Sequence, residues 1–110
     1  MPKVVWIIDP EQWPRAFLRA ELIERGYDAV GYLTASDALA TLRGRFPDSI
    51  IVDLRATTRD DVERLFQIGV PVIGISGQTP QEWVAEFPWA ALLKLPISIG
   101  EIATLVSQNI

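Results

Sequence analysis

Short apolar runs alternate with amphipathic segments along the whole of this chain, and this alternation limits its possible folds more than any other feature. The apolar runs, which are rich in Val and Ile and typical of buried strands, are residues 3–8, 27–33, 49–52, 70–75 and 90–95. The segments that we predict to be helical are residues 13–25, 35–46, 58–68, 81–87 and 99–109. Five strands that alternate with five helices predict an α/β fold, a parallel sheet with helices on both faces, and the length fits a single domain over residues 1–110.

The helical segments carry signals for their inner faces and their starts. In the first segment we expect Phe17, Leu18, Leu22 and Ile23 to face inward. Thr79 with Glu82, and Ser98 with Glu101, have the spacing of capping boxes, in which a hydroxyl accepts a hydrogen bond from the first turn. These features are structural, and they carry no functional prediction.

Composition excludes several classes of function. Ten basic and fourteen acidic residues give a net charge of -4, which argues against binding to nucleic acid or to an anionic membrane. The chain has no Cys and no His, so thiol catalysis, Ser-His triads and His-bound metals are excluded. The N-terminus leads directly into the first strand, without a signal peptide or membrane span, so we expect a cytoplasmic protein.

Polar residues follow the predicted strands at one edge of the predicted sheet. The first strand is followed by Asp9, the third by Asp53 and the fourth by Ser76, and Lys94 lies near the end of the fifth. In open parallel sheets, function concentrates at the carboxyl ends of the strands. If the first and third strands are neighbours, Asp9 and Asp53 lie close together, and oxygen ligands without His or Cys suit Mg²⁺. The alternatives are structural: a loop cap for Asp53, a turn residue for Ser76 and a solvated charge for Lys94.

Asp9 also has a structural alternative, because it can cap the first helix with Pro10 at the first helical position. Pro14 argues against this cap, since its ring would clash with the Pro10 carbonyl inside such a helix. A helix that starts near Gln12 or Trp13 accommodates Pro14 in its first turn. Asp9 is then left in a loop, free to act.

The chain resembles the receiver domains of two-component response regulators, which are CheY-like, over essentially all of its length. The matching segments are residues 4–9 (VVWIID), 24–27 (ERGY), 35–39 (ASDAL), 47–55 (PDSIIVDLR) and 70–77 (VPVIGISG), with Arg15 six residues after Asp9. This resemblance implies a doubly wound, flavodoxin-like fold whose five-stranded parallel sheet has the order 2-1-3-4-5.

The resemblance also implies roles for three residues. Asp53 stands at the phosphoryl-acceptor position, and Asp9 stands at the first of two acidic positions that hold Mg²⁺ together with the acceptor. Ser76 stands where a hydroxyl binds the phosphoryl oxygen and relays the switch. The partners would be a histidine kinase or phosphotransfer protein and a downstream protein, with a homodimer as a further option. Enzymatic activity would be limited to self-phosphorylation and dephosphorylation at Asp53.

The sequence departs from the family pattern at several positions. Pro10 occupies the second acidic position, where it cannot ligate a metal, and the neighbouring Glu11 is a candidate ligand instead. Leu95 stands where a lysine is expected, and Lys94 is one residue early, so it reaches the site only through a bulge or offset. Leu92 replaces the aromatic residue of the family's switch. We expect the first change to weaken Mg²⁺ binding and the second to remove a charge partner of the phosphoryl group. The third removes one way of coupling phosphorylation to a change at the surface.

Two functional hypotheses therefore stay open. One is a phosphorylation switch at Asp53. The other is a phosphorylation-independent pseudo-receiver that acts as a constitutive interaction or dimerisation module. Trp83, Phe87 and Trp89 would support the second hypothesis if they form an exposed contact patch, whereas the alternative is that they fill the core around a shortened fourth helix.

Overall fold

The computed structural model describes residues 1–110, except for the side chain of Ala56. Its five-stranded parallel sheet has the order β2-β1-β3-β4-β5, which confirms the predicted topology. The strands are β1 (Val4–Ile8), β2 (Asp28–Tyr32), β3 (Ser49–Asp53), β4 (Val72–Ser76) and β5 (Ala91–Lys94). The helices are α1 (Gln12–Glu24), α2 (Ala35–Ala40), α3 (Arg59–Phe66) and α4 (Ile99–Asn109), with 3₁₀ helices η1 (Leu54–Ala56) and η2 (Glu82–Glu86).

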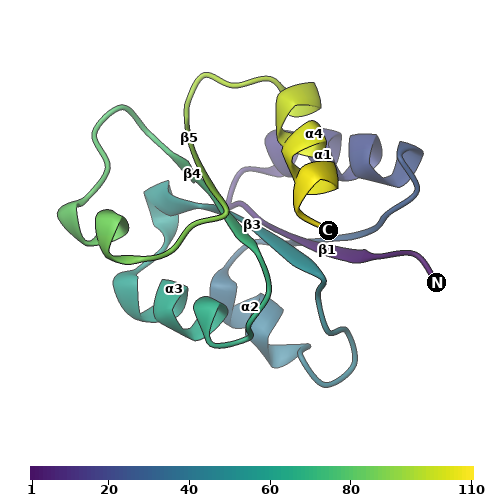
Figure 1. Ribbon diagram of the computed structural model, residues 1–110, viewed down its shortest axis with the longest axis horizontal. Helices are drawn as coiled ribbons and strands as arrows, with labels where there is room; N and C mark the ends of the chain where they lie inside the picture. Colours follow the sequence, from purple (N-terminus) through teal and green to yellow (C-terminus); the bar gives the residue numbers. More distant parts are fainter.

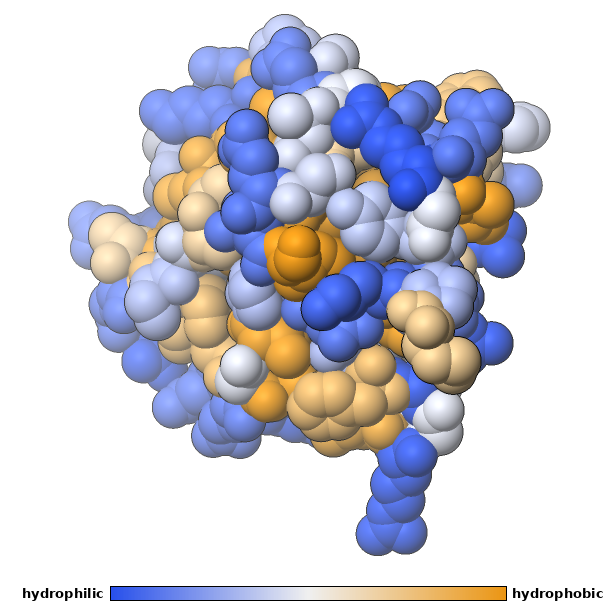
Figure 2. All heavy atoms as spheres, turned by 45° about the vertical axis from the view of Figure 1, so that its right-hand side comes forward, coloured by the Kyte–Doolittle hydropathy of each residue, from blue (hydrophilic) through white to orange (hydrophobic). Residues whose placement is uncertain are grey.

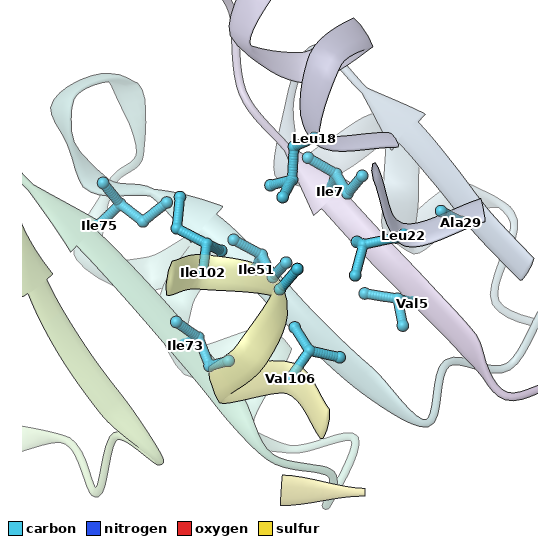
Figure 3. Packing of buried hydrophobic residues seen from close by; sticks show 11 residues of the cluster. Val5, Ile7, Leu18, Leu22, Ala29, Ile51, Ile73, Ile75, Ile102 and Val106 are labelled. Atoms are coloured by element: carbon cyan, nitrogen blue, oxygen red, sulfur yellow. The ribbon is translucent and has the colours of Figure 1, made fainter. Parts of the chain in front are cut away.

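Two hydrophobic clusters hold the three layers together, one on each face of the sheet. Figure 1 shows α1 and α4 on one side of the sheet and α2 and α3 on the other. Because successive strand residues point to opposite faces, the odd-numbered and even-numbered strand residues pack against different helices. The first cluster, most of which Figure 3 shows, contains Val5, Ile7, Ile51, Ile73 and Ile75 from the strands with Leu18, Leu22, Ile102 and Val106 from α1 and α4. The second contains Trp6, Ile8, Ile50, Val52 and Val72 with Ala38, Val62 and Leu65 from α2 and α3.

Helix α1 begins where the proline argument placed it, but two of its apolar residues face solvent. Pro14 lies in the first turn of α1, where its missing N–H costs no hydrogen bond. Leu18 and Leu22 are buried as predicted, whereas Phe17 is 57% exposed and Ile23 is 45% exposed. Leu18 and Leu22 are four residues apart and share the face of α1 that packs on the sheet. Successive residues of an α-helix are rotated by about 100°, so their neighbours Phe17 and Ile23 point away from that face. The inward placement that we predicted for Phe17 and Ile23 is therefore wrong.

Two predicted helices are shorter or of another type. Helix α2 ends at Ala40. The N–H of Thr41 donates to the carbonyl of Ala38, three residues earlier, at 3.0 Å, and this 3₁₀-type hydrogen bond tightens the last turn of the helix. Residues 82–86 form a 3₁₀ helix rather than the predicted α-helix, and Thr79 does not cap it. In contrast, Ser98 caps α4 as predicted, because its hydroxyl accepts from the N–H of Glu101 at 3.1 Å.

The aromatic residues after β4 pack against the second cluster, which favours their interpretation as core. The Phe87 ring stacks on Phe66 of α3 with centroids 5.2 Å apart, and the Trp89 ring meets Phe66 edge-on at 5.0 Å. The Trp89 ring also lies over Gly74 of β4, where an added Cβ would come within 3.0 Å of it. Together with Trp83, these half-buried side chains cover the sheet where η2 is too short to do so.

The surface is mixed in character. On the face drawn in Figure 2, hydrophobic side chains form small groups between hydrophilic ones. On α1, Trp13 and Phe17 stack at 6.0 Å and are exposed by 65% and 57%. Among the described residues, no helix has the length and hydrophobicity needed to cross a membrane.

Candidate functional site

Asp9 and Asp53 come together at the carboxyl ends of β1 and β3, as the sequence predicted. Strand β1 pairs with β3 in a register that places Ile8 opposite Val52, so the two following carboxylates share one edge of the sheet. Both side chains line one hollow of about 190 Å³, and they are only 8% and 2% exposed. Two buried carboxylates so close together need a positive charge or a proton.

The hollow itself has mostly apolar walls. Its polar lining is Asp9, Glu11, Asp53 and Arg55. Its apolar lining comes from α1, β4, the segment between β5 and α4, and α4 itself: Pro14, Leu18, Ile75, Leu95, Ile97, Ile99 and Ile102. Because apolar walls exclude water, charges inside the hollow act on each other more strongly than they would on the open surface.

Asp9 lies in the loop between β1 and α1, and it does not cap the helix. Its Oδ1 accepts a hydrogen bond from the N–H of Glu11 at 2.8 Å, while Glu11 is itself the N-cap residue of α1. The Asp9 carbonyl accepts from Arg15 Nη1 at 2.7 Å. Burial raises the pKa of the Asp9 carboxyl, the nearby Asp53 charge raises it further, and the Glu11 N–H acts in the opposite direction. The charged form of the Asp9 carboxyl is therefore destabilised in the folded protein.

Asp53 is held by Arg55, two residues further along the chain. The Arg55 N–H donates to Asp53 Oδ1 at 2.9 Å. In the side chain, Nε donates to Oδ1 at 3.0 Å and to Oδ2 at 3.1 Å, and Nη2 donates to Oδ2 at 2.5 Å. The hydrogen bonds to Asp53 raise the pKa of the Arg55 guanidinium. Both oxygens of the predicted phosphoryl acceptor are thus engaged by one arginine.

Sequence reasoning missed Arg55 as a site residue. The 3₁₀ helix η1 begins directly after Asp53, and Asp53 is its N-cap residue, so the chain turns back at this point. This turn brings the Arg55 side chain over the carboxylate, and Nη2 also lies 3.4 Å from Glu11 Oε1. A basic residue two positions after a buried strand-ending Asp is the signal that could have indicated the pair.

Ser76 ends β4 as predicted, but it faces a neighbouring hollow. Its side chain is 1% exposed, and its hydroxyl donates to the Gly77 carbonyl at 3.0 Å. Ser76 lines a second hollow, of about 250 Å³, with Gly77, Gln78, Thr79 and Trp83 among its other walls. Arg55 lines both hollows, so the hollow of Asp9 and Asp53 and the hollow of Ser76 are neighbours at this edge of the sheet.

Comparisons with known proteins agree on one fold. No protein-family model matches the sequence, and no curated protein matches it. Among solved structures, a response regulator receiver protein from Pseudomonas putida matches with a TM-score of 0.82 and 25% identity, over 98% of each chain. A receiver protein from Sinorhizobium medicae matches with a TM-score of 0.82 and 20% identity, over 98% of this chain and 94% of the other. A CheY-like receiver domain from Methanospirillum hungatei matches with a TM-score of 0.83 and 17% identity, over 98% of this chain and 93% of the other. The chain has the fold of a response regulator receiver domain.

Within this receiver fold, the structure does not bring Lys94 to the site. Strand β5 pairs with β4 in regular register, with Lys94 opposite Ser76, so no bulge shifts its side chain. Leu93 and Leu95 pack against the cluster beneath α1 and α4, and Lys94, between them, points to the other face and is exposed. Leu95 lines the hollow at the position where the receiver pattern has lysine. An apolar side chain therefore replaces a cation there.

The residues of this receiver fold do not fit a magnesium ion in the observed arrangement. Among the described residues, no group of three acidic, His or Cys side chains gathers in a way that could hold a metal. Both oxygens of Asp53 are hydrogen-bonded to Arg55, and Pro10 offers no side-chain ligand beside Asp9. Glu11, the other candidate ligand, is directed to Arg55 instead.

Asp9→Asn is expected to stabilise the receiver fold at neutral pH, by about 1 kcal/mol. The raised pKa of Asp9 means that the folded protein holds this proton to a higher pH than the unfolded chain, whose carboxyl has an ordinary value near 3.8. The contribution of Asp9 to the free energy of unfolding is therefore largest below the pKa of the unfolded chain. It is lost as the pH rises through the higher pKa of the folded protein. Asparagine keeps the Oδ1 acceptor for Glu11 and avoids this loss. Urea unfolding at pH 7 should show the gain.

The same measurement at pH 3 is the control for Asp9→Asn. Asp9 is largely protonated in both states there, so the difference between the variant and the wild type should nearly disappear. A variant that is less stable than the wild type at pH 7 would contradict the interpretation, because it would mean that the Asp9 charge is well compensated in the folded protein.

Proposed function

We propose that this chain is a signalling domain of the response regulator type that acts through contacts with other proteins, without phosphorylation of Asp53. The observation that carries this proposal is the ion pair of Asp53 with Arg55, in which a carboxylate that is 2% exposed uses both oxygens. A receiver fold with such a site is best suited to work as a constitutive interaction module.

The chemistry of phosphoryl transfer supports this proposal. Attack on phosphorus needs a free carboxylate lone pair, and the transferring group needs cations to balance its developing negative charge. At this site the nucleophile is occupied, and Leu95 stands in place of a basic residue from β5. Arg55 is the basic residue among those described around the hollow, and its hydrogen bonds go to the nucleophile itself.

A phosphorylation switch is the second candidate function, and the position of Asp53 favours it. Asp53 ends β3 beside Asp9, which is the placement expected of a phosphoryl acceptor with its acidic neighbour. In that case Arg55 would have to release Asp53 and bind the phosphoryl oxygens, and a histidine kinase or phosphotransfer protein would be the donor. Ser76 would then have to turn toward the site from its present bond to Gly77.

Incubation with acetyl phosphate and Mg²⁺, followed by intact-mass measurement, distinguishes the two candidates. We expect no phosphoryl adduct on the wild type, because Asp53 is not free to attack. Asp53→Asn is the control for attachment at any other site. An adduct on the wild type that is absent from Asp53→Asn would overturn the proposal and establish the phosphorylation switch.

A further inference from the structure

We propose that the Arg55 guanidinium is a built-in counterion that takes the place of a divalent cation between the carboxylates and keeps such a cation out. This inference rests on the proposed function, because it explains why a receiver fold with Asp9 and Asp53 in place would work without metal and phosphate. It assigns to a residue of the chain the role that Mg²⁺ would otherwise have at this edge of the sheet.

The charges around the hollow support this assignment. Three carboxylates, those of Asp9, Glu11 and Asp53, line it, and among the residues described there Arg55 alone is basic. Arg55 bonds both oxygens of Asp53 and reaches Glu11 Oε1 at 3.4 Å, so one guanidinium bridges two acidic side chains. A guanidinium presents several donors in a fixed plane, and it can therefore satisfy two oxygens of a carboxylate at once, as a metal ion does.

The tether to Asp53 gives this internal cation an advantage over a free ion. Arg55 is two residues from Asp53, and its own N–H is fixed to Asp53 Oδ1 by η1. A group attached in this way has a high effective concentration at its partner, which a dissolved ion must exceed in order to compete. Mg²⁺ also releases its bound water reluctantly, which adds to the cost of displacing the guanidinium.

Removal of the guanidinium would leave the carboxylates in place without a counterion. The Arg55 side chain is 41% exposed, so it can be shortened without opening the hydrophobic core. Asp53 would keep its backbone hydrogen bond from residue 55, while Asp9 would stay fixed by the N–H of Glu11. Asp9 and Asp53, two buried carboxylates that line the same hollow, could then each offer an oxygen to Mg²⁺ or Mn²⁺, with water molecules as the remaining ligands.

Metal titration of the wild type, Arg55→Ala and Arg55→Gln tests the inference. We expect Arg55→Ala to bind Mg²⁺ at least about tenfold more tightly than the wild type, in isothermal titration calorimetry. In NMR spectra, Mn²⁺ should broaden the backbone amides of Asp9 and Asp53 in the variant at concentrations that leave the wild type unchanged. Arg55→Gln keeps a neutral hydrogen-bond donor for Asp53 and should also bind Mg²⁺ more tightly than the wild type. This variant replaces the alanine variant in the test if Arg55→Ala does not fold.

Two further variants locate the effect. Arg45→Ala removes the same charge from an exposed ion pair with Asp28, at 2.8 Å and outside the hollow, and it should leave metal binding at the wild-type level. Arg55→Ala combined with Asp53→Asn should lose the gained affinity, because a ligand is removed.

The outcomes separate this inference from the proposed function. Wild-type protein that binds Mg²⁺ at Asp9 and Asp53, or folded Arg55 variants that gain no affinity, would overturn the counterion role. Neither of these metal-binding results bears on phosphorylation of Asp53. The acetyl phosphate experiment on the wild type measures that phosphorylation separately. Conversely, an adduct on the wild type would overturn the proposed function whatever the metal titration of the variants shows.

Discussion

Arg55→Ala is expected to lower the free energy of unfolding by about 2 kcal/mol at neutral pH. The reason is that Asp53, which is 2% exposed, would lose all its side-chain hydrogen bonds to Arg55 and keep a buried negative charge beside Asp9. Removing one partner of a fully buried ion pair costs about 3 to 5 kcal/mol, and the expected loss is smaller here because Arg55 is 41% exposed to solvent. Urea unfolding followed by circular dichroism measures it.

A double-mutant cycle tests the origin of this loss. Asp53→Asn removes the charge that Arg55 compensates, so Arg55→Ala should cost much less in an Asp53→Asn background than alone. Arg45→Ala, which breaks an exposed ion pair, should cost less than about 1 kcal/mol. A loss for Arg55→Ala no larger than that for Arg45→Ala would contradict the idea that the pair holds the site together.

The stability of Arg55→Ala is also linked to the metal inference. A ligand that binds only the folded state stabilises it in proportion to the logarithm of its concentration above the dissociation constant. If the variant binds Mg²⁺ at Asp9 and Asp53, added Mg²⁺ restores part of the lost stability. The wild type, in which Arg55 occupies Asp53, gains nothing from the same addition.

Trp89→Ala is expected to cost about 3 kcal/mol, at the lower end of the range for removal of a large aromatic side chain, because Trp89 is only partly buried. Its ring covers Gly74 of β4 and contacts Phe66 of α3 at 5.0 Å. Its Nε1 donates to the Val84 carbonyl at 2.7 Å and so fastens η2 to the sheet. Thermal and urea unfolding should both show the loss.

Two matched variants separate packing from the hydrogen bond. Trp89→Phe keeps an aromatic ring over Gly74 but removes the donor to Val84, so it should cost less than the alanine variant. Trp83→Ala removes another member of the same aromatic group, and its loss is expected to be smaller because the atoms nearest to Gly74 come from Trp89 and Leu92, while Trp83 meets Phe87 edge-on at 6.0 Å. A Trp89→Ala variant as stable as the wild type would show that these aromatics form an exposed patch instead of core.

The sequence determined the fold and the frame of the site. Apolar runs separated by helical segments predict a parallel sheet, because a strand buried on both faces needs helices above and below it. Parallel strands end at one edge, so the sequence alone is enough to place Asp9 and Asp53 together. Pro14 fixed the start of α1, since its ring excludes a helix that begins at Pro10. These predictions depend on the chemistry of single residues and on the spacing of apolar residues along the chain.

Tertiary structure decided which charges occupy the site. The regular register of β5 puts Leu95 into the hollow and Lys94 outside it, and adjacent positions on a strand differ by a whole face of the sheet. Arg55 reaches Asp53 through the turn of η1 and through one orientation of a long, flexible side chain. Residue periodicity carries information about which face a backbone position takes, but a long side chain at a loop finds its partner only when the elements around it are in place.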